Sequence, residues 1–142
     1  MNRSNKEVSK FRLDGQAALV TGSTRGIGWA IARGMAESGS TVYVNGRDKK
    51  VLAARCKNLI DLGYDAKPAF FDATNIEAIN RFLDYTETPI DILVNNAAIR
   101  LRKPLNEISP KAFSEVLEAN LTSIYAISRS FAARLEDQQT NG

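Results

Sequence analysis

The chain has 142 residues, of which 44% are hydrophobic, and its 19 Lys and Arg against 16 Asp and Glu give a net charge of +3 at pH 7. This composition is typical of a single globular domain and argues against a disordered chain. The sequence contains no His, which excludes a Ser-His-Asp triad, a Cys-His pair and a His-ligated zinc site. Cys56 is the single cysteine, so no disulfide forms within the chain, and we expect it to be a buried apolar residue rather than a reactive thiol.

The basic residues are scattered among acidic ones, so the charge pattern gives no sign of a nucleic-acid interface. The first dozen residues are polar and lack the apolar run of a signal peptide, and no later segment reaches the ~18 apolar residues of a membrane span. We therefore expect a cytoplasmic protein that does not bind membranes. Its predicted organisation is a polar N-terminal segment, 1–12, followed by one domain, 13–142.

Short apolar runs alternate with segments of helical periodicity, which is the pattern of βαβ units in a parallel sheet. The predicted strands are Ala17–Val20, Thr41–Val44, Lys67–Phe71 and Asp91–Val94. Three helices are predicted between these strands, each with a stripe of residues that faces the core. The stripe of the first helix is Ile27, Ala30, Ile31, Gly34 and Met35. That of the second is Leu52, Cys56, Leu59 and Gly63, and that of the third is Ile76, Ile79, Leu83 and Thr86. We expect Asp48 to cap the second helix and the capping box Thr74-x-x-Glu77 to open the third.

A fourth helix is predicted from Ser109-Pro110, a cap residue followed by proline, to about Asp137. Its predicted buried stripe is Phe113, Leu117, Leu121, Ile124, Ile127 or Ser128, Phe131 and Leu135. A polar tail, 138–142, follows, and no fifth strand is present, so the strand at 91–94 is expected to form an exposed sheet edge through which the chain self-associates or forms a homo-oligomer.

The segment Thr21 to Gly28 reads TGSTRGIG, directly after a predicted strand and directly before an amphipathic helix. A dinucleotide pyrophosphate needs backbone amides at a helix N-terminus, a tight turn out of the strand, and no Cβ where phosphate or a neighbouring helix comes close. Gly22, Gly26 and Gly28 supply these needs. The spacing is G-x-x-x-G-x-G rather than G-x-G-x-x-G, and a glycine turn that serves packing alone is the alternative interpretation.

The end of the second strand indicates which dinucleotide is bound. An NAD site usually has an acidic residue there, about 20 residues after the loop, to accept the ribose 2′-hydroxyl. This chain has Asn45-Gly46-Arg47 instead. Gly46 leaves room, and Arg47, together with Arg25 from the glycine loop, can form charge-assisted hydrogen bonds to a 2′-phosphate. The sequence therefore favours NADP(H) over NAD(H).

These residues resemble the classical short-chain dehydrogenase/reductase family. TGSTRGIG matches the TGxxxGxG loop of that family, DILVNNAA from Asp91 to Ala98 resembles its fourth strand and NNAG motif, and Asn120 matches its helical active-site asparagine. The resemblance implies a Rossmann-type doubly wound parallel sheet, truncated here after the fourth strand and fourth major helix. It also implies a cofactor site formed by Gly22, Ser23, Thr24, Arg25, Gly26, Ile27, Gly28, Asn45, Gly46, Arg47, Asp72, Ala73, Asn96 and Ala97, with Asn95 linking the fourth strand to its neighbours.

The run RLRKPL from Arg100 is similar to gluconate 5-dehydrogenase-type members of the family, as is NGRD at the second strand. Arg100, Arg102 and Lys103 would suit an anionic sugar-acid or acyl substrate. A solvated loop is the alternative interpretation of these three cations.

The proton donor of the family is a Tyr followed four residues later by Lys, beside a catalytic Ser. The residues at that spacing are Arg47 after Tyr43, Pro68 after Tyr64, Pro89 after Tyr85 and Arg129 after Tyr125. None forms the pair, and we expect Tyr125 to lie on a helix surface. Asn120 is thus the one expected catalytic residue, and no metal ligands are expected.

The sequence therefore predicts the nucleotide-binding half of an NADP(H)-dependent oxidoreductase that acts on a small-molecule carbonyl or secondary alcohol and is inactive on its own. A non-catalytic dinucleotide-binding or subunit-pairing module is the second interpretation. A fragment or an interrupted reading frame is the third.

Overall fold

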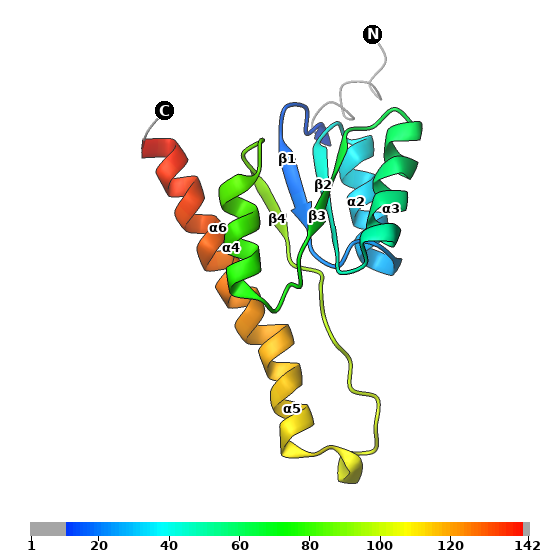
Figure 1. The fold of residues 1–142 in the computed structure, drawn as a ribbon, viewed down its shortest axis with the longest axis vertical. Coiled ribbons are helices and arrows are strands. Elements are labelled where there is room, and N and C mark those ends of the chain that lie inside the picture. The colour runs from blue at the N-terminus through cyan, green and yellow to red at the C-terminus, as the bar shows by residue number, and fades with distance from the viewer. Residues whose placement is uncertain (1–10, 141–142) are drawn as a thin grey trace.

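The computed structural model describes residues 11–140 and contains a four-stranded parallel sheet in the order β3-β2-β1-β4 (Figure 1). The strands are β1 (Ala17–Val20), β2 (Thr41–Gly46), β3 (Ala66–Phe70) and β4 (Ile92–Val94). The α-helices are α2 (Gly26–Glu37), α3 (Lys49–Asp61), α4 (Ile76–Tyr85), α5 (Pro110–Leu117) and α6 (Ser123–Thr140). The predicted parallel α/β fold is confirmed, with strand ends displaced by one or two residues. Residues 1–10 of the predicted N-terminal segment 1–12, and residues 141–142 of the predicted tail 138–142, lie outside the described residues.

Helices cover both faces of the sheet. On one face α2 and α3 pack against Val20, Val42 and Val44, and on the other α4 and α6 pack against Leu19 and Tyr43. Each strand of the centre therefore buries both its faces, as parallel strands do when helices cross over on either side. All four residues of β1 are buried, whereas all three of β4 are only half-buried. Among the described residues β4 pairs with β1 alone, so its outer edge is open as predicted.

The face of α2 that meets the sheet differs from the prediction. Gly28, Ala32 and Ala36 are buried, whereas Ile27 is 69% exposed and Ala30 is also exposed. Small residues let the helix approach the sheet closely, and the large apolar residues chosen by periodicity flank that contact line. The prediction was therefore wrong for Ile27 and Ala30, whereas Ile31 and Met35 are partly buried and pack against the core. The stripe of α3 is confirmed through Leu52, Cys56 and Leu59, but Gly63 lies exposed in the turn beyond the helix.

The helix caps are partly as predicted. The Asp48 carboxylate accepts hydrogen bonds from the backbone N–H groups of Lys50 and Val51, which confirms it as the cap of α3. The capping box at Thr74 was wrong, because the cap of α4 is Asn75, whose side chain accepts from the Ala78 N–H. The Thr74 hydroxyl donates instead to the Asp72 carboxylate at 2.9 Å.

The predicted fourth helix is divided by a π turn, Glu118–Thr122, between α5 and α6. Both the N–H and the hydroxyl of Ser123 donate to the Glu118 carbonyl, which closes this wider turn. The additional residue in the turn rotates the helix before it relative to the helix after it. Ile127 is buried, as predicted, but Phe113 is 54% exposed and Leu121 is 64% exposed, so the N-terminal half of the predicted buried stripe was wrong.

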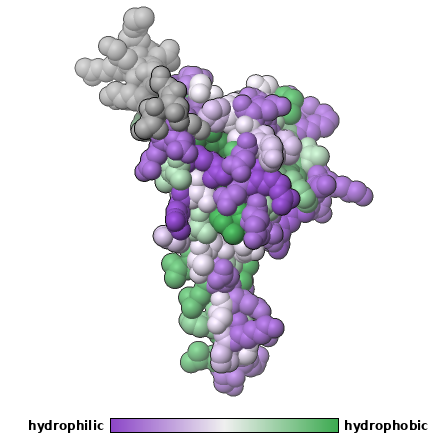
Figure 2. Space-filling view, turned by 60° about the vertical axis from the view of Figure 1, so that its left-hand side comes forward, coloured by the Kyte–Doolittle hydropathy of each residue, from purple (hydrophilic) through white to green (hydrophobic). Residues whose placement is uncertain are grey.

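The N-terminal end of α5 projects away from the sheet. The segment between β4 and α5 runs out to this end, and the chain returns through α5 (Figure 1). Hydrophobic surface is visible on this projection (Figure 2). Its exposed apolar side chains include Leu105, Phe113, Leu117 and Leu121, and Tyr125 is exposed farther along the chain, where α6 lies beside α4. The predicted surface position of Tyr125 is confirmed. No helix in the described part of the chain is long and apolar enough to cross a bilayer.

The core on the α3 side gives a direct test of this packing. Leu59 is fully buried and the adjacent Ile60 is 54% exposed, so the two positions differ in environment but share one helix. We expect Leu59→Ala to lower the free energy of unfolding by about 2 to 5 kcal/mol, because it leaves a cavity against the sheet. Ile60→Ala, the control, should change it by no more than about 0.5 kcal/mol. Urea denaturation followed by circular dichroism measures both, and equal losses would contradict the assigned orientation of α3.

Candidate functional site: a glycine loop at the carboxyl end of the sheet

The loop between β1 and α2 leaves the sheet at the carboxyl end of its central strand. Gly26 has φ +57°, a backbone conformation that disfavours other residues, and the space beside it where a Cβ would stand is open. Gly28 has no such room, because a Cβ there would lie 2.3 Å from Asn96 Nδ2 and 2.6 Å from the Gly22 carbonyl oxygen. The two glycines thus serve different needs, one an open surface and the other close packing, as predicted for a dinucleotide loop.

Two buried polar residues hold the loop against the neighbouring strand. The Asn45 side chain accepts from the Gly22 N–H at 2.9 Å and donates to the carbonyls of Ala69 and Phe71 at 2.9 and 3.1 Å. The Ser23 hydroxyl donates to the Val20 carbonyl at 2.6 Å and accepts from the Asn45 N–H at 2.8 Å. Both side chains are buried and hydrogen-bonded within the protein. Asn45 and Ser23 therefore fix the buried side of the loop to the ends of the neighbouring strands.

The segment after β4 is joined to the same loop. The Thr21 hydroxyl accepts from the N–H groups of Asn96 and Ala97 at 2.9 and 3.0 Å. The Asn96 side chain donates to the carbonyls of Thr21 and Gly22 at 2.9 and 3.1 Å. Sequence reasoning did not single out Thr21, and the signal that could have found it is a hydroxyl residue at the end of an otherwise apolar strand. Asn95, which was expected to link β4 to its neighbours, donates instead to the Ser128 hydroxyl on α6.

The N-terminus of α2 has no side-chain cap. Arg25 occupies the capping position, but its side chain makes no capping hydrogen bond, and the first turn contains no acidic residue. The first N–H groups of a helix lack partners within the helix and carry partial positive charge, so they favour an anion. The exposed residues Arg25, Gly26 and Ile27 surround this helix start. The arrangement can accept a phosphate group.

Arg47 and Asp72 face each other across the ends of β2 and β3. Arg47 Nη1 donates to the Asp72 carboxylate at 3.2 Å, and the Arg47 side chain is 78% exposed. Partial burial acts to raise the pKa of Asp72, but hydrogen bonds from Thr74 and Arg47 outweigh it and hold the pKa below its ordinary value. The structure thus places Asp72 beside the expected phosphate-binding arginine. Gly46 packs close to Thr24, since a Cβ on Gly46 would lie 2.5 Å from Thr24 Cγ2.

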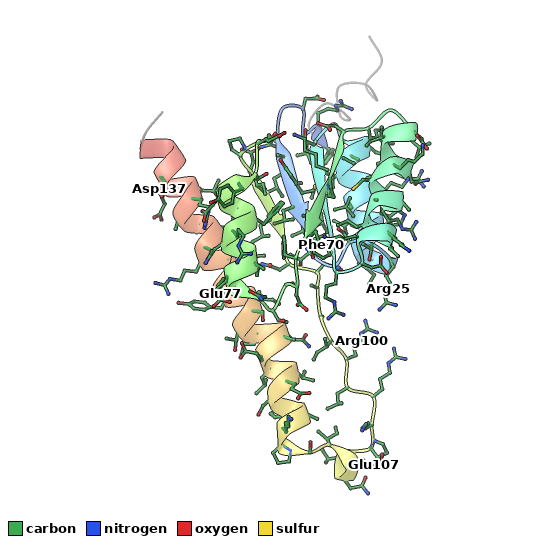
Figure 3. The ribbon with its side chains drawn as sticks, viewed as in Figure 1. Arg25, Phe70, Glu77, Arg100, Glu107 and Asp137 are labelled. Atoms are coloured by element: carbon green, nitrogen blue, oxygen red, sulfur yellow. The ribbon has the colours of Figure 1, made fainter. Side chains whose placement is uncertain are left out.

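Asn120 lies in the π turn and contacts the loop after β4. Its Oδ1 accepts from the Ile99 N–H and its Nδ2 donates to the Ile99 carbonyl, both at 2.9 Å. This bidentate contact fixes the backbone directly before Arg100. In Figure 3, Arg25 and Arg100 both lie beyond the carboxyl ends of the strands, the edge at which sheets of this kind bind ligands. π turns occur frequently at functional sites.

The described residues contain no group of three or more His, Cys, Asp or Glu that could hold a metal ion. Cys56 is buried, and burial raises the pKa of its thiol, which makes the thiolate scarce at neutral pH. The described site presents the backbone amides at the start of α2 and exposed arginines, and both kinds of group bind anions.

Comparison with known proteins places these features in a family. The sequence profile of the short chain dehydrogenase family matches residues 16–142. The gluconate 5-dehydrogenase of Gluconobacter oxydans is 36% identical over 128 residues, which are 88% of this chain and 50% of that protein.

Solved structures agree. A gluconate 5-dehydrogenase from Burkholderia cenocepacia in complex with NADP and tartrate is 35% identical with a TM-score of 0.83, over 93% of this chain and 53% of that one. A 3-oxoacyl (acyl-carrier-protein) reductase from Agrobacterium tumefaciens with NADP bound is 34% identical with a TM-score of 0.80, over 90% of this chain and 50% of that one. The chain spans about half the length of these relatives. With the glycine loop, the strand order and the sequence match in agreement, the chain belongs to the short-chain dehydrogenase family.

Proposed function

We propose that this chain binds NADP(H) at its glycine loop and forms the nucleotide-binding half of an oxidoreductase that acts on a carbonyl or secondary alcohol. The observation that supports it most is the uncapped start of α2, with open space at Gly26 and exposed Arg25 beside it. A pyrophosphate supplies the acceptors that these amides lack. We assign the backbone of the loop from Gly22 to Gly28 to the pyrophosphate, and Asp72, Ala73, Asn96 and Ala97 to the adenosine and ribose.

The preference for NADP(H) over NAD(H) rests on the charges at the end of β2. The position of the usual ribose-binding acid is taken by Gly46, and Arg47 follows it. The ion pair of Arg47 with Asp72 is exposed, and such pairs contribute only about 0 to 1 kcal/mol, so a phosphate dianion can compete for the guanidinium. Two solved relatives contain NADP, which supports the same assignment.

For the substrate we propose a small anionic molecule, with a sugar acid as the leading class. Arg100, Arg102 and Lys103 are exposed on the loop after β4, and Asn120 fixes that loop at Ile99. Relatives are named for gluconate and for 5-keto-D-gluconate, both of which are sugar acids. The three cations are suited to pairing with a carboxylate.

The nicotinamide cofactor, when bound, supplies the hydride. The reaction also needs a proton donor beside the developing alkoxide. No Tyr in the 142 residues is followed by Lys at the fourth position, and Tyr125 is 65% exposed on the helix surface. We therefore assign Asn120 to positioning within the site and propose that these residues bind cofactor without turnover.

A second candidate function, a module that pairs with another subunit, is favoured by one observation. Phe113, Leu117, Leu121 and Tyr125 recur every four residues and are all exposed along the helix from α5 to α6. Exposed apolar residues gathered on one surface mark interaction sites. This pairing is compatible with dinucleotide binding, because the apolar stripe and the glycine loop are separate parts of the molecule (Figure 1).

Dinucleotide binding can be measured directly. We expect NADPH to bind the chain about a hundredfold more tightly than NADH, because two charge-assisted contacts to the extra phosphate, from Arg47 and Arg25, each contribute about 1.5 to 3 kcal/mol. Arg47→Gln should reduce that difference about tenfold, whereas Arg33→Gln, a change at an exposed ion pair on α2, should leave it unaltered. Isothermal titration calorimetry measures all six affinities, those of the wild-type chain and the two variants for NADPH and NADH. Equal binding of NADPH and NADH would contradict the cofactor assignment, and absence of binding would overturn the proposed function.

Turnover is tested separately from binding. We expect the 142-residue chain, mixed with NADP⁺ and gluconate or with NADPH and a keto sugar acid, to show no change in nicotinamide absorbance above the protein-free rate. The reason is the missing Tyr-Lys pair. Rates comparable to those of a complete family member would show that another residue donates the proton.

Self-association follows from the exposed stripe and the open β4 edge. We expect the sedimentation coefficient to rise with protein concentration, and the double variant Leu117→Glu/Leu121→Glu to reduce this rise, since two charges cannot be buried in an apolar contact without a large cost. Leu62→Glu, at an apolar residue 54% exposed at the end of α3, is the matched control. A wild-type chain that stays monomeric over a wide concentration range would rule the pairing out.

A further inference from the structure

Arg55 of α3 makes two contacts with the region around the glycine loop. Its Nε donates to the carbonyl oxygen of Thr24 at 2.8 Å. Its guanidinium carbon lies 4.6 Å from the centre of the Trp29 ring, over the ring face. Thr24 belongs to the loop and Trp29 to the first turns of α2, so one side chain from the next helix contacts both sides of the exposed Arg25. Arg55 is itself half-buried, which makes these contacts stronger than they would be in open water.

The contact with Thr24 bears on the two arginines proposed to hold the 2′-phosphate. The Thr24 carbonyl and the Arg25 N–H belong to one rigid peptide plane, so a hydrogen bond to the carbonyl holds the peptide that carries the Arg25 Cα and restricts the directions that the Arg25 side chain can take. Thr24 also contacts Gly46, the residue directly before Arg47, through its Cγ2 atom. Thr24 is therefore held between Arg55 on one side and the end of β2 on the other.

We propose that Arg55 is a positioning residue that sets the preference of this site for a 2′-phosphorylated dinucleotide, by holding the Thr24–Arg25 peptide in place through its hydrogen bond and its stacking on Trp29. The inference rests on the proposed function. It requires the planar guanidinium, because the ammonium group of Lys has neither the Nε–H of the contact nor a flat face to lie on an aromatic ring.

Without the hydrogen bond from Arg55 to Thr24, the contact that is weakened is the one between Arg25 and the 2′-phosphate of the cofactor. NADPH gains from Arg25 only when that side chain is directed to the 2′-phosphate, whereas NADH has no group at that place. Removing Arg55 thus weakens NADPH binding much more than NADH binding. A residue that only stabilised the fold would weaken both equally.

The test compares Arg55→Met, Arg55→Lys and Trp29→Leu with the control Arg33→Met, which removes an exposed arginine of α2 that pairs with Glu37. Isothermal titration calorimetry of the full chain gives the NADPH and NADH affinities, and urea denaturation shows that each variant is folded. For Arg55→Met we expect NADPH affinity to fall about tenfold, the effect of one charge-assisted contact, and NADH affinity to fall less than about twofold. Arg55→Lys should recover little, Trp29→Leu should give a smaller loss of NADPH affinity, and Arg33→Met should change neither.

The outcomes distinguish a failure of the role proposed for Arg55 from a failure of the proposed dinucleotide binding. If the wild-type chain binds neither dinucleotide, the proposed function fails. If it prefers NADPH and Arg55→Met keeps the same NADPH to NADH ratio, the role of Arg55 is overturned while the function stands. Full recovery in Arg55→Lys would assign the effect to charge alone and would also overturn the positioning role. Should Arg55→Met not fold, Arg55→Lys and Trp29→Leu decide the question by the same ratio.

Discussion

The site depends on the hydrogen bonds made by the buried side chain of Asn45. From the end of β2 it accepts from the Gly22 N–H of the loop and donates to two carbonyls at the end of β3. It is 2% exposed, so these groups would be without partners if it were removed, and unpaired buried polar groups cost about 1 to 3 kcal/mol each. One amide thus joins the carboxyl ends of three strands. Thr21 and Asn96 extend the connection to β4, so the loop is fixed before any ligand arrives.

The sequence was sufficient for the strands and for the glycine loop, because their signals are local. A four-residue apolar run such as β1 and a glycine spacing can both be recognised within one segment. The face of α2 could not be recognised in this way. Its contact with the sheet is made by Gly28, Ala32 and Ala36, and residues with little side chain contribute little to a periodicity of hydrophobicity. The π turn was missed for a related reason, since a helical period assumes one constant rotation per residue and this turn changes it.

The contacts around the loop were beyond sequence reasoning, because they join residues far apart in the chain. Arg55 reaches Thr24 across 31 positions, and Asn120 reaches Ile99 across 21. A half-buried arginine on α3 has the sequence pattern of any solvent-facing helical residue. Asn45 and Ser23 had been assigned to the cofactor, and the structure shows that their side chains are directed into the protein. Only the fold distinguishes a side chain on the open surface of the loop from a buried side chain that holds the loop in place.

The projection of α5 gives the two sides of the site unequal rigidity. The nucleotide side is built on buried strands, whereas the loop bearing Arg100 leaves the body and returns through a helix whose apolar residues face water. Opening that segment breaks few buried contacts, so we expect its backbone amides to exchange with solvent deuterium sooner than those of β1. The glycine loop is thus held in one shape by buried hydrogen bonds, whereas few buried contacts hold the segment that bears Arg100.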